Sequence, residues 1–574
     1  MIRIKQAPSE KFPRIFLFAL LLSLNLPFFE GAASGGGEEA RIPITVDASK
    51  PGLPLGRVWP FFGFDECNFA VVPDALDLME TLSASQPDPV YLRCHFLLNT
   101  GNGEPALKWG STNAYNEDAL GRPVYDWTIM DRIMDAFVRS GCRPLVEVGF
   151  MPKALSVRAE PYRHVYPPNQ WAGWAYPPKD YTKWAALIRE WAGHSRDRYG
   201  SAEQTWLWEL WNEPDIFYWQ GSFEDYCRLF DFTEAALHGA MPLAALGGPH
   251  TTSPSYPRPA AFLRGFLKHC SNGTNSVTGR TGTRLDYVGF HSKGSTSMAD
   301  KHPRMNLGLN LASNKAGFGI VAEFPAYQNT PIIIGECDPE GLAALSSTVH
   351  PANGYRNGSA YAAYEAALMK HTLDLAERAG VNLKGVLTWA FMFEGKGYFE
   401  GFRTLATNGV HKPVLNVFKM LGMLEGNRIP LVSEGALGAD RIIADRVIRR
   451  PDIDGMAAAG EDSARIMVWN YHDDVAPAPP QPVRLSVIAP DSAAGRARVT
   501  HFRIDDEHSN AFTRWLKLGS PGSPSAEMAS ELKKSGELET LGPAVFLPVK
   551  EGKIGLDFDL PRHAVSLIEI RWIR

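Results

Sequence analysis

Short apolar runs alternate with amphipathic segments between residues 60 and 400, and this repeated order constrains the possible folds most. Eight of the runs have the length and the β-branched or aromatic content of buried strands, and they begin near residues 61, 89, 143, 205, 243, 285, 331 and 385. The segments between them, such as 127–141 and 181–192, carry apolar residues at intervals of three and four, as amphipathic helices do. Eight strand–helix units in succession predict an α/β fold, a (β/α)8 TIM barrel, over residues 55–427.

A different pattern follows the predicted barrel. Between 428 and 574, short runs of alternating apolar and polar residues are separated by clusters of Pro, Gly and Asp, which is typical of an antiparallel β-sandwich. Residues 41–54 contain an alternating stretch, I-P-I-T-V-D, that has no place before the first barrel strand. We therefore expect this N-terminal strand to join the C-terminal sandwich domain.

The first 34 residues have the layout of a signal peptide. Basic residues, a short apolar run and the small residues G-A-A-S follow one another. A membrane anchor is the alternative, but the run is short for a bilayer span and is interrupted by Asn25 and Pro27. We expect an exported protein, secreted or periplasmic, with no membrane partner once the signal is removed. Retention of an uncleaved signal stays open.

Charge and cysteine content narrow the possible partners. The chain has 574 residues and a formal net charge of -5, so nothing in its composition indicates binding to nucleic acid or to an anionic membrane surface. Its six cysteines are scattered and have no C-x-x-C spacing, which argues against a zinc site and against a disulfide-rich scaffold. We expect buried thiols, with room for one disulfide, and neither a metal nor a cofactor.

The active site of a TIM barrel lies at the carboxyl ends of its strands. Polar side chains stand at or just after these ends in the sequence: Asp65, Glu66, His95, Glu147, Asn212, Glu213, His291, Lys293, Glu336 and Glu394. Each of them has a structural alternative, because a polar side chain at a strand end commonly forms a hydrogen bond within the fold. Together they predict a site rich in carboxyl groups and imidazoles at one rim of the barrel.

Two of the carboxyl groups fit the chemistry of glycoside hydrolysis. That reaction needs one carboxyl group to protonate the leaving oxygen and a second to meet the positive charge at the anomeric carbon. Glu213 ends the fourth predicted strand and Glu336 the seventh, so closure of the barrel brings them together. Glu209 precedes Glu213 within the apolar stretch W-L-W-E-L-W. The period of a strand turns its side chain into the barrel, and we interpret it as structural.

Several motifs resemble a known family. W-N-E-P-D, at 211–215, is similar to the acid/base motif of the large clan of retaining glycosidases on TIM barrels. The resemblance narrows with L-R-C-H-F-L-L (92–98), L-G-G-P (246–249), the block 267–294 that ends in G-F-H-S-K-G, G-E-C-D-P-E-G (335–341), F-R-T-L (402–405) and the segment 502–521. On these motifs the chain resembles glycoside hydrolase family 39, and within it the α-L-iduronidases. β-Xylosidases belong to the same family.

The resemblance implies roles for individual residues. Glu213 would be the acid/base and Glu336 the nucleophile of a retaining mechanism, with carboxyl groups about 5 to 5.5 Å apart. Lys293 and Arg403 match a lysine and an arginine that hold the carboxylate of a uronic acid, and a buried carboxylate does need such cations. The remaining members of the expected substrate site are Asn212, which would bind the hydroxyl next to the anomeric carbon, and His95, His291, Gly341 and Glu394.

Three departures from the iduronidase pattern concern the sugar rather than the reaction. Ile216 and Phe217 replace a histidine pair, and Glu394 is the nearest counterpart of an aspartate in that pattern. The loop after Glu336 is about one residue shorter, which affects the match of Gly341. The leading hypothesis is a retaining exo-glycosidase that acts on a uronic-acid-type sugar of an oligosaccharide or polysaccharide. A β-xylosidase or another glycosidase of the same family is the alternative. A carbohydrate-binding protein without activity is a third hypothesis. Such a protein would be expected to lack one of the two catalytic carboxylates, and both are present here.

Overall fold

The computed structural model describes residues 41–573, apart from 51, 165–171, 390, 391, 492 and 494. The expected signal peptide, 1–34, lies outside the described residues. In the part of the chain that the structure describes, no helix combines the length and the apolar character needed to cross a membrane.

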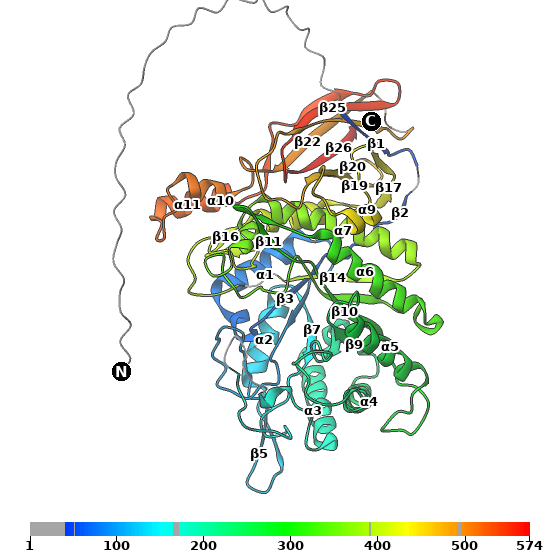
Figure 1. The fold of residues 1–574 in the computed structure, drawn as a ribbon, viewed down its shortest axis with the longest axis vertical. Coiled ribbons are helices and arrows are strands. Elements are labelled where there is room, and N and C mark those ends of the chain that lie inside the picture. Colours follow the sequence, from blue (N-terminus) through cyan, green and yellow to red (C-terminus); the bar gives the residue numbers. More distant parts are fainter. Residues whose placement is uncertain are drawn as a thin grey trace, which may run out of the picture. The chain divides into compact units, whose positions relative to one another are not determined.

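Eight parallel strands form a closed barrel in the order β10-β13-β14-β3-β4-β7-β8-β9, and helices surround them (Figure 1). The strands are β3 (Phe61–Phe64), β4 (Tyr91–Cys94), β7 (Arg143–Val148), β8 (Leu207–Leu210), β9 (Ala245–Thr251), β10 (Tyr287–Lys293), β13 (Ile332–Asp338) and β14 (Leu383–Trp389). Each begins within two residues of its predicted position. The predicted α/β fold, a (β/α)8 TIM barrel with an additional β domain, is confirmed.

The long helices of the barrel begin and end at residues suited to those positions. They are α1 (Pro73–Ser85), α2 (Thr128–Arg139), α3 (Tyr181–Tyr199), α4 (Phe223–Ala240), α5 (Pro257–Asn272), α6 (Leu307–Ala322), α7 (Ser359–Ala379) and α8 (Pro413–Met423). Asp180 caps α3 by accepting hydrogen bonds from two backbone N–H groups, and Ser222 and Asp225 form a capping box at α4. Gly380 ends α7 in the left-handed conformation, with φ 63°.

Two sheets form the additional domain, with strands grouped away from the barrel strands in Figure 1. Their orders are β18-β1-β21-β25 and β2-β17-β19-β20-β26-β22-β23, with β24 paired to β22. The strands are β1 (Ile42–Asp47), β2 (Leu53–Pro54), β17 (Asn427–Ile429), β18 (Leu431–Ser433), β19 (Asp452–Ala459), β20 (Ser463–Tyr471), β21 (Gln481–Ile488), β22 (Arg496–Ile504), β23 (Glu539–Thr540), β24 (Val545–Pro548), β25 (Lys553–Leu560) and β26 (Val565–Ile573). Strand β1 lies between β18 and β21, and it runs parallel to β21 while the other pairs are antiparallel.

Apolar side chains from both sheets fill the space between them. Ile44 and Val46 of β1 belong to the same buried cluster as Val468 of β20 and Ile568 of β26. Alternate residues of each strand point inward, which explains the alternating pattern of the sequence. The short helices of this region are α9 (Ala439–Asp445), α10 (Ala511–Lys517) and α11 (Ala526–Ser535).

Helix α7 connects the barrel to the sandwich. Lys370 Nζ lies 2.6 Å from Asp454 Oδ2, and His371 Nε2 lies 3.2 Å from Asp452 Oδ2, with both aspartates on β19. The rings of Tyr364 on α7 and Tyr471 on β20 are also in contact. The domains therefore share a buried and partly ionic interface.

All six cysteines are buried, and none forms a disulfide. Burial raises the pKa of each of the thiols Cys67, Cys94, Cys142, Cys227, Cys270 and Cys337. The expectation of buried thiols is confirmed, and the disulfide for which the sequence left room does not form.

Candidate active site

Neighbouring strands bring the predicted site residues together at the carboxyl end of the barrel. A register shift between Phe290 and His291 sets His291 of β10 opposite Glu336 of β13, and Lys293 opposite Asp338. Glu213 follows β8, and its N–H donates a 3.0 Å hydrogen bond to the carbonyl of His250 at the end of β9. Sequentially distant polar residues therefore meet because their strands are neighbours in the barrel.

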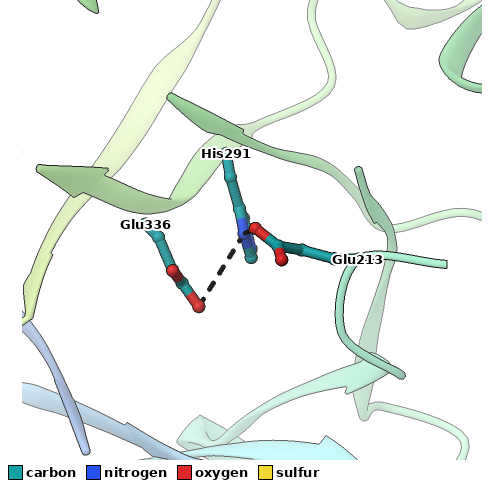
Figure 2. A group of neighbouring side chains, drawn as sticks. All are labelled: Glu213, His291 and Glu336. Carbon is teal, nitrogen blue, oxygen red and sulfur yellow. Dashed lines mark hydrogen bonds and ion pairs between the residues drawn. The ribbon is translucent and has the colours of Figure 1, made fainter. Parts of the chain in front are cut away.

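Glu213 and Glu336 face each other across His291 (Figure 2). His291 Nδ1 lies 3.0 Å from Oε1 of Glu213 and 3.8 Å from Oε1 of Glu336. One oxygen of Glu213 and one of Glu336 lie within 4.8 Å of each other. This spacing is close to the separation of about 5 to 5.5 Å in retaining glycosidases, and it is shorter than the separation in inverting enzymes.

The backbone that presents Glu213 is held in an unusual conformation. Glu213 has φ 46° and Trp211 has φ 68°, in the left-handed region that residues other than glycine seldom adopt. Such conformations persist where the surrounding structure imposes them, and they cluster at functional sites. Here Trp211 is buried, and its indole N–H donates a 2.9 Å hydrogen bond to the carbonyl of Tyr218.

The two carboxyl groups have opposite protonation preferences. Burial, followed by the negative charge of Glu336, raises the pKa of Glu213 to about 7. Burial raises the pKa of Glu336, but the ammonium of Lys293, together with the imidazoles and the Arg93 guanidinium around the carboxylate, holds that pKa well below its ordinary value. Near neutral pH, one group holds a proton and the other is ionised, which is the state that acid-assisted nucleophilic attack needs.

Arg93 joins Glu209 and Asn212 of the W-L-W-E-L-W-N-E-P-D stretch to Glu336. Its Nε donates to Glu209 at 2.5 Å, NH1 to Glu336 at 3.0 Å and NH2 to Asn212 at 2.9 Å. His250 Nε2 lies 2.9 Å from the other oxygen of Glu209. Burial raises the pKa of Glu209, but Arg93 and His250 lower it to about 2. Glu209 is thus an ionised, fully buried partner of Arg93, in accord with its structural interpretation.

His95 lies between the nucleophile candidate and another buried carboxylate. Its Nδ1 is 2.6 Å from Glu147 Oε2, and its Nε2 is 3.5 Å from Glu336 Oε1. Burial lowers the pKa of His95, but the charge of Glu147 raises it to about 9. The imidazole is therefore protonated at neutral pH and adds a positive charge beside Glu336.

Lys293 contacts the oxygen of Glu336 that is not the one near His95, and Asp338 lies between Lys293 and Arg403. Lys293 Nζ lies 2.7 Å from Glu336 Oε2 and is also paired with Oδ2 of Asp338. NH1 of Arg403 lies 3.5 Å from the same Asp338 oxygen and 3.6 Å from Glu340 Oε1. The Nε of Arg403 is buried without a hydrogen-bond partner among the described residues. Both cations therefore already have carboxylate neighbours from the chain itself.

Two expected members of the site lie apart from these contacts. Glu394 is exposed, and it forms no hydrogen bond or ion pair with any described residue. Gly341 is also exposed, and the space where its side chain would stand is open. The structure thus groups His95, Asn212, Glu213, His291, Lys293, Glu336 and Arg403, and it leaves Glu394 and Gly341 outside the group.

Some residues of the group were not predicted from the sequence. Arg93 and Asp338 stand two positions from His95 and Glu336, so the period of a strand places them on the same inward face. Lys108 reaches the site from a loop, and Glu340 and Arg356 support Arg403 from the segment after β13. The two-residue period of a strand could have identified Arg93 and Asp338. No periodic pattern identifies Lys108, Glu340 or Arg356.

Two clusters of described residues have the side chains of a metal site but do not suit a cation. In the first, Glu213, His291 and Glu336 offer one atom each within 4.8 Å, yet Lys293 and Arg93 already contact both oxygens of Glu336. In the second, His371, Asp452 and Asp454, the ammonium of Lys370 pairs with Asp454. An added metal ion would meet like charge in either place.

Two facing carboxyl groups at the carboxyl ends of the strands of a closed (β/α)8 barrel are the arrangement that retaining glycoside hydrolases use. Residues 42–541 match the family described as Glycosyl hydrolases family 39. The chain belongs to glycosyl hydrolase family 39, a retaining family, and its substrate is a carbohydrate.

Relatives in this family carry two different names. The chain is 26% identical to a β-xylosidase of Geobacillus stearothermophilus, over 84% of this chain and 86% of that protein. It is 23% identical to the α-L-iduronidase of Mus musculus, over 92% and 80% of the two chains. The crystal structure of a monomeric β-xylosidase from Caulobacter crescentus CB15 superimposes with a TM-score of 0.72 at 20% identity, covering 93% of this chain and 100% of that chain. The fold is shared, and the relatives do not agree on a sugar.

Proposed function

We propose that the protein is a retaining exo-glycosidase in which Glu213 is the general acid/base and Glu336 the nucleophile. Glu213, protonated below about pH 7, gives its proton to the glycosidic oxygen while the Glu336 carboxylate attacks the anomeric carbon. The leaving group departs, and a covalent glycosyl-enzyme remains. The observation that carries this assignment is the contact within 4.8 Å between carboxyl groups of opposite protonation preference.

The second half of the reaction follows from a change in charge. Formation of the ester removes the negative charge of Glu336, which is one of the two main causes of the raised pKa of Glu213. The pKa of Glu213 then falls, so Glu213 acts as the base that takes a proton from the incoming water. The water attacks the anomeric carbon, Glu336 leaves as a carboxylate, and the sugar retains its configuration.

Replacement of each carboxyl group tests these roles. Glu336→Gln is expected to abolish turnover, and azide added to Glu336→Gly is expected to give a glycosyl azide of inverted configuration. In Glu213→Ala, azide is expected to give a product of retained configuration instead. Ordinary activity in Glu336→Gln would overturn the nucleophile assignment.

For the sugar, we propose a uronic-acid-type pyranoside, as in the α-L-iduronidases. Lys293 and Arg403 place two positive charges on one side of Glu336, and the unpartnered Nε of Arg403 offers a further donor. A carboxylate on the sugar would be bound there by charge-assisted hydrogen bonds. Asn212, whose Oδ1 accepts from Arg93, keeps its amide N–H groups for the hydroxyl next to the anomeric carbon.

A β-xylosidase is the second candidate, and a specific observation favours it. Asp338 and Glu340 already lie beside Lys293 and Arg403, so a neutral sugar would not leave these cations without partners. Turnover of nitrophenyl xyloside, glucuronide and iduronide by the wild type, Lys293→Met and Arg403→Met enzymes separates the two. Loss of uronide turnover alone in the variants supports the uronate, whereas a wild type that hydrolyses the xyloside but neither uronide, at a rate that neither change affects, rejects it.

Export is proposed from the layout of residues 1–34, namely basic residues, an apolar run and small residues. Expression of the full chain in a Gram-negative host, followed by N-terminal sequencing of the periplasmic fraction, tests this. A mature protein that begins near residue 35 is expected, and an intact N-terminus in the cytoplasmic fraction would contradict it.

A further inference from the structure

Asp65 and Lys108 form an ion pair beside the catalytic carboxyl groups that the proposed mechanism does not use. Lys108 Nζ lies 2.5 Å from Asp65 Oδ1, and the Asp65 side chain is only 1% exposed. His95 Nε2 lies 3.7 Å from the same Asp65 oxygen and 3.5 Å from Glu336 Oε1. A single imidazole therefore separates this pair from the proposed nucleophile.

The loop that carries Lys108 is fixed in place. Its backbone has φ 53°, and its N–H donates to the carboxyl group of Glu66. Asn68 and Ser111 exchange two hydrogen bonds of 2.8 Å, which tie this loop to the segment after β3. A left-handed backbone held by such contacts is a feature of functional sites, and here it directs a lysine toward Asp65.

Both members of the pair retain hydrogen-bonding capacity. Oδ2 of Asp65 is buried and has no partner among the described residues. The ammonium of Lys108 has three N–H donors, and its side chain is 18% exposed, similar to the 17% of Lys293. A buried ion pair by itself contributes little net stability, and a buried unpaired oxygen calls for an explanation. A hydroxyl group, which both donates and accepts, would satisfy the two side chains together.

Building on the proposed function, we propose that Asp65 and Lys108 bind the hydroxyl groups of the cleaved sugar that are remote from its anomeric carbon. Glu336 approaches C1, and Asn212 is assigned to the hydroxyl on C2. Lys293 contacts Oε2 of Glu336, whereas His95, on the side of the pair, contacts Oε1. With the C5 substituent at Lys293 and Arg403, the hydroxyls on C3 and C4 are those that face Asp65 and Lys108.

This assignment adds a reason for cleavage at chain ends. Asp65 and Lys108 recognise the C3 and C4 hydroxyls only when these are free, because a further sugar on either oxygen would remove the donated proton and crowd the pair. The terminal, unsubstituted sugar is therefore the form that the two side chains select.

Deoxy substrates combined with variants test the assignment as a double-mutant cycle. The probes are nitrophenyl β-D-xyloside or methylumbelliferyl α-L-iduronide, whichever the wild type hydrolyses, and the 3-deoxy and 4-deoxy forms of that glycoside. The wild type is expected to lose about 100-fold or more in kcat/KM on at least one deoxy form, because loss of a hydroxyl leaves buried polar groups unpaired. Lys108→Met and Asp65→Asn are expected to lose a similar factor on the parent glycoside and almost nothing further on that deoxy form.

The assignment would be overturned if each variant lost as much activity on going from the parent to the deoxy substrate as the wild type does. In that case the effects of the substitution and of the missing hydroxyl would simply multiply. Lys179→Met, which removes a lysine paired with Glu117 near the surface, is the matched control and is expected to behave as wild type. If Lys108→Met does not fold, the cycle with Asp65→Asn decides. If Glu336→Gln hydrolyses the parent glycoside, the proposed function itself fails. If Glu336→Gln is inactive but the effects multiply in the cycle of variants and deoxy substrates, only the roles of Asp65 and Lys108 are rejected.

Discussion

NH1 of Arg93 donates a 3.0 Å hydrogen bond to Oε1 of Glu336, so a fully buried guanidinium supports the proposed nucleophile from within the barrel. The other nitrogens of the same group hold Glu209 and Asn212. One side chain thus fixes the positions of the proposed nucleophile Glu336, of the Asn212 amide that we propose to bind the sugar, and of the buried Glu209. The fork geometry of a guanidinium allows this, and a lysine could not reproduce it.

Arg93→Met is expected to impair both stability and catalysis. It removes the guanidinium that is paired with the buried carboxylates of Glu209 and Glu147, and only the imidazoles of His250 and His95 remain beside them. Loss of one partner of a buried ion pair costs about 3 to 5 kcal/mol in the free energy of unfolding. The substitution also removes a positive charge that lies beside Glu336 and lowers its pKa. The pKa of Glu336 therefore rises, and the acidic limb of the pH profile of kcat/KM moves to higher pH. Denaturant unfolding and the pH profile measure the two effects. An unchanged acidic limb in a folded variant would contradict the link to Glu336, and Arg93→Lys, which keeps the charge, is the control.

The pH dependence of the wild type follows from the two carboxyl groups. Glu213 must be protonated to act as acid, and its pKa is raised to about 7, so kcat/KM is expected to fall as pH rises through about 7. Glu336 must be ionised, and its pKa is lowered, so activity is lost only at strongly acidic pH. With a dinitrophenyl leaving group, which needs no proton, Glu213→Gln is expected to lose the basic limb. A basic limb that persists in this variant would assign the acid to another group.

The barrel could be predicted from the sequence because its strands are buried on both faces. Such strands appear as short, nearly continuous apolar runs, and Ile332–Asp338 is an example whose residues are all buried. The carboxyl ends of parallel strands meet at one rim, so Glu213 and Glu336 could be paired without knowledge of their distance. The two-residue period of a strand also predicted that the side chain of Glu209 points into the barrel.

The rest of the site depends on loops and on ionic partners, which have no period. Glu394 follows the last barrel strand closely in the sequence, yet its side chain is exposed. Lys108 precedes a hairpin, and only contacts with Glu66 and the Asn68–Ser111 pair bring it to the site. The pairing of Lys293 with Asp338 depends on the register of β10 and β13, which the sequence does not encode locally.

Asp338→Asn is expected to shift substrate preference toward uronides. Asp338 is buried and paired with Lys293 and Arg403, so its charge competes with a carboxylate on the sugar. The amide keeps an oxygen that can accept the 2.9 Å hydrogen bond from the N–H of Trp389. We expect the ratio of kcat/KM for iduronide to that for xyloside to rise by about tenfold, equal to about 1.4 kcal/mol. An unchanged ratio would show that this carboxylate does not act on the sugar.

Glu340→Gln is expected to destabilise the segment after β13. Glu340 accepts from NH2 of Arg356 at 2.6 Å and from the hydroxyl of Tyr355 at 2.7 Å, and Arg356 is fully buried. Burial raises the pKa of Glu340, but Arg356 and Arg403 lower it below its ordinary value. Its stabilising effect is therefore present above the pKa of an unfolded glutamate and is lost as pH falls. Urea unfolding at neutral pH is expected to show a loss of about 3 kcal/mol, and the difference from wild type is expected to shrink in acid.

The thiol of Cys337, although adjacent to the proposed nucleophile, is expected to be inert. Burial raises its pKa, its side chain contacts Asn310 and Asn314 behind β13, and the thiolate is the reactive form of cysteine. Because all six cysteines are buried and free, iodoacetamide is expected to leave the native enzyme fully active and unlabelled. The same reagent in denaturant is expected to label all six, as counted by mass spectrometry. Rapid labelling of Cys337 in the folded enzyme, with loss of activity, would show that the strand bearing Glu336 opens to solvent, and Cys337→Ala would then be expected to resist the reagent.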